Sequence, residues 1–138
     1  MDTFTNEQRS RCMSKIKSKN TKPELAVRKV LINLGVRYRL HDKKLPGKPD
    51  ISNGKRNFVL FINGCFWHQH EGCNRSILPK SNTEYWLKKL EHNIQKQRAD
   101  VEKLINLGWN VFIIWECHTK GEKQLELLLQ EILNDKLS

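Results

Sequence analysis

One stretch of the sequence decides the fold: LPGKPDISNGKRNFVLFIN, from Leu45 to Asn63. Its prolines and first glycine predict a turn that ends just before Asp50. Asn53 and Gly54 can both adopt positive φ angles, which predicts a tight hairpin. The hairpin joins a strand that Asp50 begins to a strand from Phe58 to Asn63. Because hairpin partners lie side by side, we expect Asp50 to meet the residues at the far end of the second strand.

Helix and strand patterns precede this hairpin. Thr21 to Glu24, TKPE, is a helix-start signature with proline in the first turn, and apolar residues follow at helical spacing up to Gly35. Val36 to Leu40 alternates apolar and basic residues, which predicts a strand. An earlier helix, Asn6 to Lys17, has only a thin apolar stripe. We therefore expect residues 1–19 to form a helical arm outside the core.

A long helix, a strand and a final helix follow the hairpin. Ser81 and Glu84 predict the start of a helix that Gly108 ends. Val111 to Trp115 is continuously apolar, as expected of a strand that is covered on both faces and runs parallel to its neighbour. Gln124 to Leu133 predicts the last helix. This order predicts an α/β fold, a mixed sheet between helices, in one domain of 138 residues.

The composition points to a nucleic-acid partner. Lysine and arginine outnumber aspartate and glutamate by 25 to 15, for a formal charge of +10. Such a charge concentrates polyanions around the protein, although it can also serve solubility alone. No apolar run approaches the length of a membrane-spanning helix, and the first twenty residues lack the apolar segment of a secretory signal. We therefore expect no membrane association, a reducing cytoplasm and no disulfides.

Cysteine and histidine gather in GCFWHQHEGC, Gly64 to Cys73. Soft sulfur and borderline nitrogen ligands in one loop, with another cysteine after the apolar strand, predict a tetrahedral structural zinc site. The candidates are Cys65, Cys73, Cys117 and either His68 or His70. Cysteine is also a common buried hydrophobe, and spacing alone leaves the choice between the two histidines open. Cys12 has no such neighbours, and we expect it to be inert.

Asp50 and His68 are the candidates for catalysis. A carboxylate at a strand start, facing a loop with histidine, suits a hard cation such as Mg²⁺ and a phosphodiester substrate. An aspartate beside proline and glycine is often only a turn former. A histidine titrates near neutral pH, so His68 could move a proton to or from a reacting oxygen.

Aromatic rings would give a basic protein a means of contacting bases. Phe66 and Trp67 either fill a small core beneath their loop or stack on and wedge between bases. Trp86, in the long helix, could do either. Asn93 and Gln97 fall beside the apolar face of that helix, so they either line a site or reach solvent at its edge.

Together these residues resemble the very-short-patch-repair (Vsr) DNA mismatch endonucleases. The similarity runs in order from about Ser10 to Cys117, and the set of motifs is far more specific than any one of them. The motifs are TKPE (Thr21 to Glu24) with Arg28, RYRLH (Arg37 to His41), LPGKPDI (Leu45 to Ile51), NGCFWH (Asn63 to His68), PKSNTEYW (Pro79 to Trp86) and GWNVFIIWEC (Gly108 to Cys117).

The resemblance implies a restriction-endonuclease-like fold with a structural zinc site. It also implies a Mg²⁺-dependent enzyme that nicks double-stranded DNA 5′ to the thymine of a T:G mismatch left by deamination of 5-methylcytosine. Asp50 would be the metal-binding carboxylate, His68 the catalytic histidine and Glu24 an acidic helper. The main-chain carbonyl of Ile62 would be a second Mg²⁺ contact. The zinc ligands would be Cys65, His70, Cys73 and Cys117.

The same resemblance implies DNA contacts and two departures. The DNA-contacting residues would be Phe66, Trp67 and Trp86 as a wedge, Lys89 and Asn93 at the mispaired bases, and Met13 from the minor groove. A T:G pair stacks poorly, so it costs less to deform than a matched pair. Gln97 stands where the family form has a carboxylate, and Asn63 where histidine is frequent. Both replacements bear on the catalytic rate, but because Asp50 and His68 remain we expect activity.

Two other functions fit the same residues. One is a restriction-type nuclease of the same fold that cuts paired DNA. The other is a zinc-stabilised module that binds deformed DNA without cutting it, which Gln97 and Asn63 favour. Because nicking one strand needs only one active site, we expect a monomer. We also expect it to act on the nucleoid in a bacterial cytoplasm. The preferred flanking bases depend on side-chain geometry in the groove.

Overall fold

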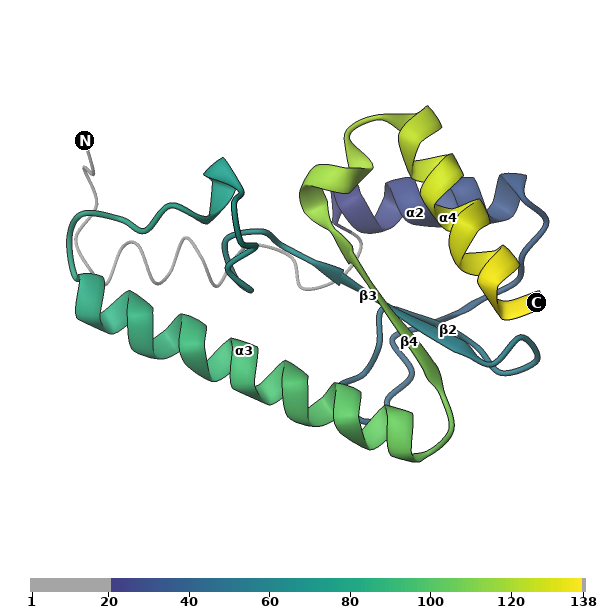
Figure 1. The fold of residues 1–138 in the computed structure, drawn as a ribbon, viewed down its shortest axis with the longest axis horizontal. Helices are drawn as coiled ribbons and strands as arrows, with labels where there is room; N and C mark the ends of the chain where they lie inside the picture. Colours follow the sequence, from purple (N-terminus) through teal and green to yellow (C-terminus); the bar gives the residue numbers. More distant parts are fainter. Residues whose placement is uncertain (1–20, 138) are drawn as a thin grey trace.

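The structure is a computed structural model that describes residues 21–137. Its centre is a four-stranded sheet in the order β1-β2-β3-β4, with helices on both sides (Figure 1). The elements are α2 (Lys22–Asn33), β1 (Arg39–Leu40), β2 (Ile51–Asn53), β3 (Phe58–Asn63), η1 (Asn74–Ser76), α3 (Thr83–Asn106), β4 (Asn110–Trp115), η2 (Glu116–Thr119) and α4 (Glu122–Leu137). The predicted first helix and arm, with Cys12 and Met13, lie outside the described residues.

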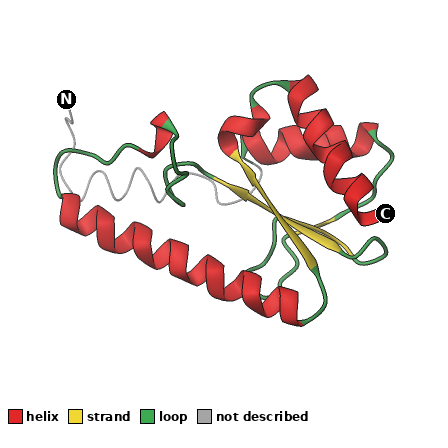
Figure 2. Ribbon diagram, viewed as in Figure 1, coloured by secondary structure: helices red, strands yellow, loops and turns green. Residues whose placement is uncertain are grey.

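Alternating side chains of β3 place a hydrophobic core on each face of the sheet. Phe58 and Leu60 belong to the core that α2 and α4 cover. Val59 and Phe61 pack with Leu104 of α3 on the other face. Figure 2 shows α2 and α4 on one side of the yellow strands and α3 on the other. Because β1, β2 and β3 pair antiparallel and β3 pairs parallel with β4, the predicted mixed sheet between helices is confirmed.

The predicted start of α2 is confirmed, but the strand after it is shorter than predicted. The Thr21 hydroxyl accepts a hydrogen bond from the Glu24 N–H at 3.4 Å, which fixes Glu24 in the first turn. At the other end the Val36 N–H donates to the Leu31 carbonyl at 2.9 Å. This bond makes Val36 part of the helix terminus, so of residues 36–40 only Arg39–Leu40 pair with β2.

The hairpin forms, but its turn is not the one predicted. Asn53 pairs with Phe58, so residues 54–57 form the loop and Asn57 has the positive φ of 60°. The Asn53 side chain accepts a hydrogen bond from the Arg56 N–H at 2.8 Å. Asn53 therefore closes a longer loop with its side-chain oxygen instead of supplying a left-handed turn residue. The strand β2 begins at Ile51, one residue after Asp50.

The remaining elements differ from the prediction in detail. α3 begins at Thr83, after Asn82 in a left-handed conformation, and not after Ser81. β4 pairs parallel with β3 as predicted and contributes to the cores on both faces, but the cover is incomplete, because Ile113 is 39% exposed. Within residues 21–137, no helix combines the length and the hydrophobicity that crossing a membrane requires.

Candidate active site and metal centres

Asp50 lies just before β2, next to the carboxyl-terminal end of β3, as the predicted hairpin implies. Its Oδ2 accepts a hydrogen bond from the Ile62 N–H at 2.7 Å. Burial raises the pKa of Asp50 to about 6; the Ile62 N–H acts against this rise, the Glu24 charge adds to it and His41 opposes it. A carboxyl in this setting ionises at a cost that a bound cation would offset.

Glu24 and His41 complete a cluster with Asp50. Glu24 is buried, and its Oε1 lies 2.7 Å from His41 Nε2 and 3.9 Å from the Arg28 guanidinium. His41 Nδ1 lies 3.8 Å from Asp50 Oδ1. One ligand atom from each of Glu24, His41 and Asp50 lies within 4.8 Å of the others, so the donor set fits a divalent cation.

The sequence motifs predicted no role for His41. The signal that could have found it is strand pairing, because Leu40 of β1 pairs with Ile51 of β2. The next residues along this antiparallel pair are His41 and Asp50, and the His41 N–H donates to the Asp50 carbonyl at 3.2 Å. The register of a strand as short as β1 cannot be read from its two residues, so the contact emerges only from the fold.

Two members of the cluster, Glu24 and Asp50, line a cavity of about 640 Å³ that His68 also lines. The Nδ1 atom of His68 is buried and has no hydrogen-bond partner among the described residues. Burial lowers the pKa of His68, so the imidazole is neutral near pH 7 and can accept a proton. Asp50 and His68 therefore face one space, as the sequence predicted.

Two amides stand on the wall of this cavity. Asn63, which is buried, and Gln97 exchange two hydrogen bonds, from Asn63 Nδ2 to Gln97 Oε1 at 2.7 Å and from Gln97 Nε2 to Asn63 Oδ1 at 2.8 Å. Asn93 Nδ2 donates to the Trp67 carbonyl at 3.5 Å. Asn93 and Gln97 of α3 therefore line the site and do not simply reach solvent at the helix edge.

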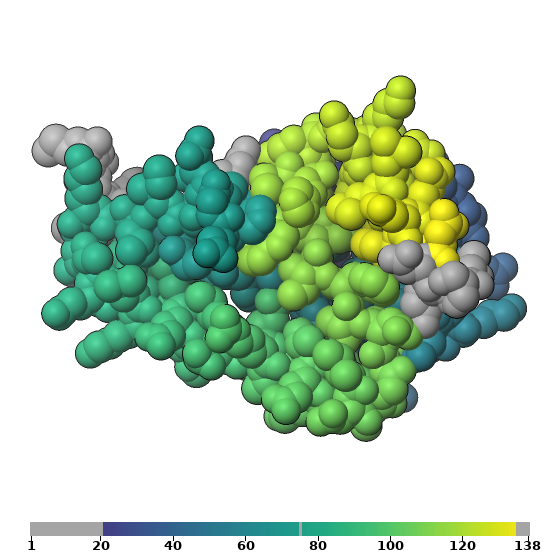
Figure 3. Space-filling model, viewed as in Figure 1, coloured from purple at the N-terminus to yellow at the C-terminus, as the bar shows by residue number. Residues whose placement is uncertain are grey.

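The Cys/His cluster lies next to this cavity, where β3 and β4 end. Asn63 pairs with Trp115 in the parallel register, so Cys65 and Cys117, each two residues further on, leave the sheet at the same edge. Figure 3 shows the teal loop after β3 against the yellow-green segment after β4. Gly72, at φ 76°, turns the loop back so that Cys73 can join the cluster.

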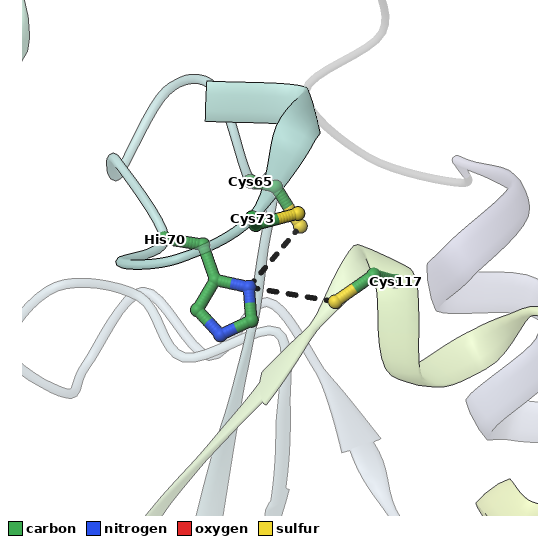
Figure 4. A group of neighbouring side chains, drawn as sticks. All are labelled: Cys65, His70, Cys73 and Cys117. Carbon is green, nitrogen blue, oxygen red and sulfur yellow. Dashed lines mark hydrogen bonds between the residues drawn. The ribbon is translucent and has the colours of Figure 1, made fainter. Parts of the chain in front are cut away.

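Four ligand atoms converge in this cluster, and the histidine among them is His70 (Figure 4). His70 Nδ1 lies 3.7 Å from Cys65 Sγ and 3.4 Å from Cys117 Sγ. Tetrahedral zinc, with bonds of about 2.0–2.3 Å, holds its ligands roughly 3.5 Å apart, so the cluster fits the ion. Burial raises the pKa of the Cys65 thiol to about 11, and its ionised form would need such a cation nearby. The His70 ring stacks on Trp115 at 4.2 Å, which fixes its orientation.

An aromatic cluster forms the outer wall of the cavity. Phe66 and Trp67 contact each other and Trp86, with ring centroids 5.4 to 6.1 Å apart. Lys89 Nζ lies 5.5 Å from the Trp67 ring centroid. Trp86 is buried, whereas Phe66 and Trp67 are half-buried. The loop rings therefore rest on Trp86 and also border the cavity, and contact of these rings with bases remains a prediction.

The family model described as DNA mismatch endonuclease Vsr matches residues 1–75. The Vsr protein of Escherichia coli is 36% identical over 136 residues, which cover 99% of this chain and 85% of that protein. The chain belongs to the Vsr family. Two proteins named type II nicking enzymes are each 44% identical to this chain. V.NmeAIP of Neisseria meningitidis matches over 95% of this chain and 96% of its own length. V.XorIIP of Xanthomonas oryzae matches over 96% of this chain and 97% of its own length.

Membership makes this Vsr protein a DNA endonuclease, and its predicted site residues gather around one cavity. Of the predicted site residues, the ones that line this cavity are Glu24, Asp50, Ile62, Phe66, Trp67, His68 and Asn93. Trp86 and Lys89 lie behind and beside the rings. Met13 lies outside the described residues. The roles of these residues remain predictions.

Proposed function

We propose that this Vsr protein is a Mg²⁺-dependent endonuclease that nicks double-stranded DNA 5′ to the thymine of a T:G mismatch. The observation that carries the proposal is the cavity shared by buried Glu24, Asp50, His68 and the Phe66–Trp67 pair. A hydrolytic centre and an aromatic wedge in one cavity would couple cutting to a deformed base pair. The mixed sheet would be the restriction-endonuclease-like core of a single domain, residues 1–138.

The acidic end of the cavity would hold the cation. Asp50, the Ile62 carbonyl and Glu24 nearby supply oxygen donors, as Mg²⁺ prefers. When bound, the ion offsets the charge of the scissile phosphate and lowers the pKa of water. His68, which is neutral near pH 7, would accept the proton of the attacking water.

The aromatic cluster would recognise the mismatch. Phe66 and Trp67, backed by Trp86, would enter the duplex beside the wobble pair, which yields more readily than a matched pair. Lys89 and Asn93, one turn apart on α3, would contact the mispaired bases, and Met13 would approach from the minor groove. The Cys65–His70–Cys73–Cys117 site, with zinc bound, would hold this loop in a fixed position relative to β4.

One assay tests the proposal against both alternatives. Zinc-loaded protein is incubated with Mg²⁺ and three duplexes of the same sequence, carrying T:G, T:A or C:G at one position. We expect a single nick in the thymine strand of the T:G duplex alone. Equal cutting of all three would identify a restriction-type nuclease, and tight binding to T:G without a product would identify a non-cleaving module.

Two variants decide whether the product comes from this site. Asp50→Ala should abolish nicking, because it removes the proposed cation ligand at the mouth of the cavity. Glu102→Ala, which removes an exposed carboxylate of α3, is the matched control and should nick as the wild type does. Repeating the assay over a panel of flanking bases would then define the site preference. We propose a monomer that acts on the nucleoid in the cytoplasm.

A further inference from the structure

His41 lies between the two carboxylates of the acidic cluster. One ring nitrogen, Nε2, is 2.7 Å from Glu24 Oε1, and the other, Nδ1, is 3.8 Å from Asp50 Oδ1. The Glu24 contact is a short hydrogen bond to a buried carboxylate, whereas 3.8 Å is too long for any hydrogen bond. The two nitrogens of one ring therefore do different things.

The short contact determines which nitrogen carries the proton in the neutral ring. The Arg28 guanidinium lies 3.9 Å from the same Glu24 oxygen. Because a carboxylate oxygen accepts hydrogen bonds, we assign the ring N–H to Nε2, which donates it to Glu24. In the neutral imidazole this leaves a lone pair on Nδ1, the nitrogen nearest Asp50.

The gap between His41 and Asp50 has the size of a ligated cation. Two metal–ligand bonds of about 2.1 Å each can span 3.8 Å at an open angle. A histidine that binds a metal through one nitrogen usually donates its other N–H to a carboxylate, which fixes the ring. Glu24, His41 and Asp50 reproduce that arrangement in order: orienting carboxylate, imidazole, metal-binding carboxylate.

We infer that His41 is a direct ligand of the catalytic cation through Nδ1, beside Asp50, and that Glu24 orients the imidazole. The inference rests on the proposed function for the identity of that cation as the nicking cofactor, and it names the class of metal. A nitrogen donor improves affinity for a transition ion such as Mn²⁺ much more than for Mg²⁺, which prefers oxygen. The His41 nitrogen would therefore raise the affinity of the site for Mn²⁺ more than its affinity for Mg²⁺.

The test uses Mn²⁺ as the probe and the zinc-loaded protein, with zinc content measured before and after. Pulsed electron paramagnetic resonance detects a ¹⁴N nucleus bound directly to Mn²⁺. We expect that coupling in the wild type, and its replacement by ¹⁵N coupling when histidine is labelled with ¹⁵N. Because the wild-type spectrum alone can contradict the inference, the test does not depend on a variant that folds: no nitrogen coupling would overturn it.

His41→Gln identifies the nitrogen. The Gln amide can still donate to Glu24 but offers no lone-pair nitrogen, so the coupling should vanish and the Kd for Mn²⁺ should rise by about tenfold or more. The Kd for Mg²⁺ should rise by a smaller factor. His92→Gln, an exposed histidine of α3, is the matched control and should change neither constant. Persistent coupling in His41→Gln would overturn the inference and point to His68.

The two proposals can fail separately. If the protein does not nick T:G duplexes but Mn²⁺ shows the His41 coupling, the metal site stands and the proposed reaction falls. If nicking is seen and the coupling is absent, the reaction stands and the His41 assignment falls. Equal rises in Kd for Mn²⁺ and Mg²⁺ in His41→Gln would also overturn the His41 assignment. Such a result would indicate a general loss of structure at the site and not the loss of a nitrogen ligand.

Discussion

The two candidate metal-binding clusters lie at the same end of the sheet, yet they are built in opposite ways. Three of the four donors of the Cys/His cluster come from one loop, residues 65–73, and the fourth follows β4. The acidic cluster takes one donor each from α2, from the residue after β1 and from the residue before β2. The first is a local motif that a single chain segment nearly completes, and the second exists only once the sheet has formed.

The difference in donors matches a difference in exposure to substrate. Four sulfur and nitrogen donors fill a tetrahedral ion and leave no position open, which is typical of a structural site. The acidic cluster has only three donors, and two of them, Glu24 and Asp50, line a cavity of about 640 Å³, so positions would stay open for water and phosphate. We therefore expect the Cys/His cluster to contribute stability and the acidic cluster to contribute reactivity.

The largest effect is expected where the structural side is broken. Cys117→Ser removes the ligand that ties the loop to the segment after β4, so zinc should be lost. The free energy of unfolding should then fall by more than about 3 kcal/mol, because binding of a structural metal contributes to folding. Elemental analysis and urea unfolding measure both quantities.

The matched control for that experiment is Cys12→Ser. The sequence gives Cys12 no metal-binding neighbours, so this variant should retain about one zinc per chain and unfold as the wild type does. A Cys117→Ser protein with full zinc content and unchanged unfolding would contradict the structural role of the cluster. Nicking should be lost with the zinc, because the same loop carries Trp67 and His68.

A smaller effect of opposite sign is expected on the reactive side. The pKa of Asp50 is raised from 3.8 to about 6, so the folded protein binds this proton more tightly than the unfolded chain does. Stability from this group is therefore complete below pH 4 and is lost as the pH rises through 6, by roughly 2–3 kcal/mol. Asp50→Asn cannot ionise and should be more stable than the wild type at pH 7, while inactive.

The measurement is urea unfolding at pH 4.5 and pH 7.5, in zinc-loaded protein without Mg²⁺. The difference between Asp50→Asn and the wild type should grow with pH, and saturating Mg²⁺ should reduce it, since the ion binds the ionised carboxylate. Glu102→Gln, at an exposed position of α3, supplies the baseline. If the difference in unfolding free energy between Asp50→Asn and the wild type did not change with pH, ionisation of the buried Asp50 would not destabilise the fold.

The same division explains how far the sequence could predict the molecule. Periodicity and capping signals predicted the helices, the parallel β4 and the mixed sheet, because these depend on neighbours a few residues apart. Turn geometry failed at Asn53, whose side chain closes a longer loop. Spacing alone also left His68 and His70 equivalent as zinc ligands, and the resemblance to the family chose His70. The structure brings His70 together with the three cysteines, and its role as a zinc ligand remains a prediction.

His41 shows what sequence reasoning could not reach. Its role depends on the register of a two-residue strand and on a buried glutamate 17 positions earlier in the chain. Neither produces a periodic or clustered pattern. The Asn63–Gln97 pair is similar: each amide looked like an isolated departure from the family form, and only the fold shows that the two departures contact each other across 34 positions.

The smallest predicted effect concerns this amide pair. Gln97→Ala leaves the buried Asn63 amide without its two hydrogen bonds to Gln97, which should cost about 1–2 kcal/mol of unfolding free energy. Asn63→Ala combined with Gln97→Ala should cost less than the sum of the two single variants, with a coupling of about 1 kcal/mol. Gln95→Ala, an exposed amide on α3, is the control for helix propensity.

Strict additivity would mean that the Asn63–Gln97 pair holds nothing in place, and the two amides would then be separate replacements for the acidic and histidine groups of the family. Coupling would mean that they act as one unit, which keeps the wall of the reactive cavity ordered without adding a charge beside Asp50.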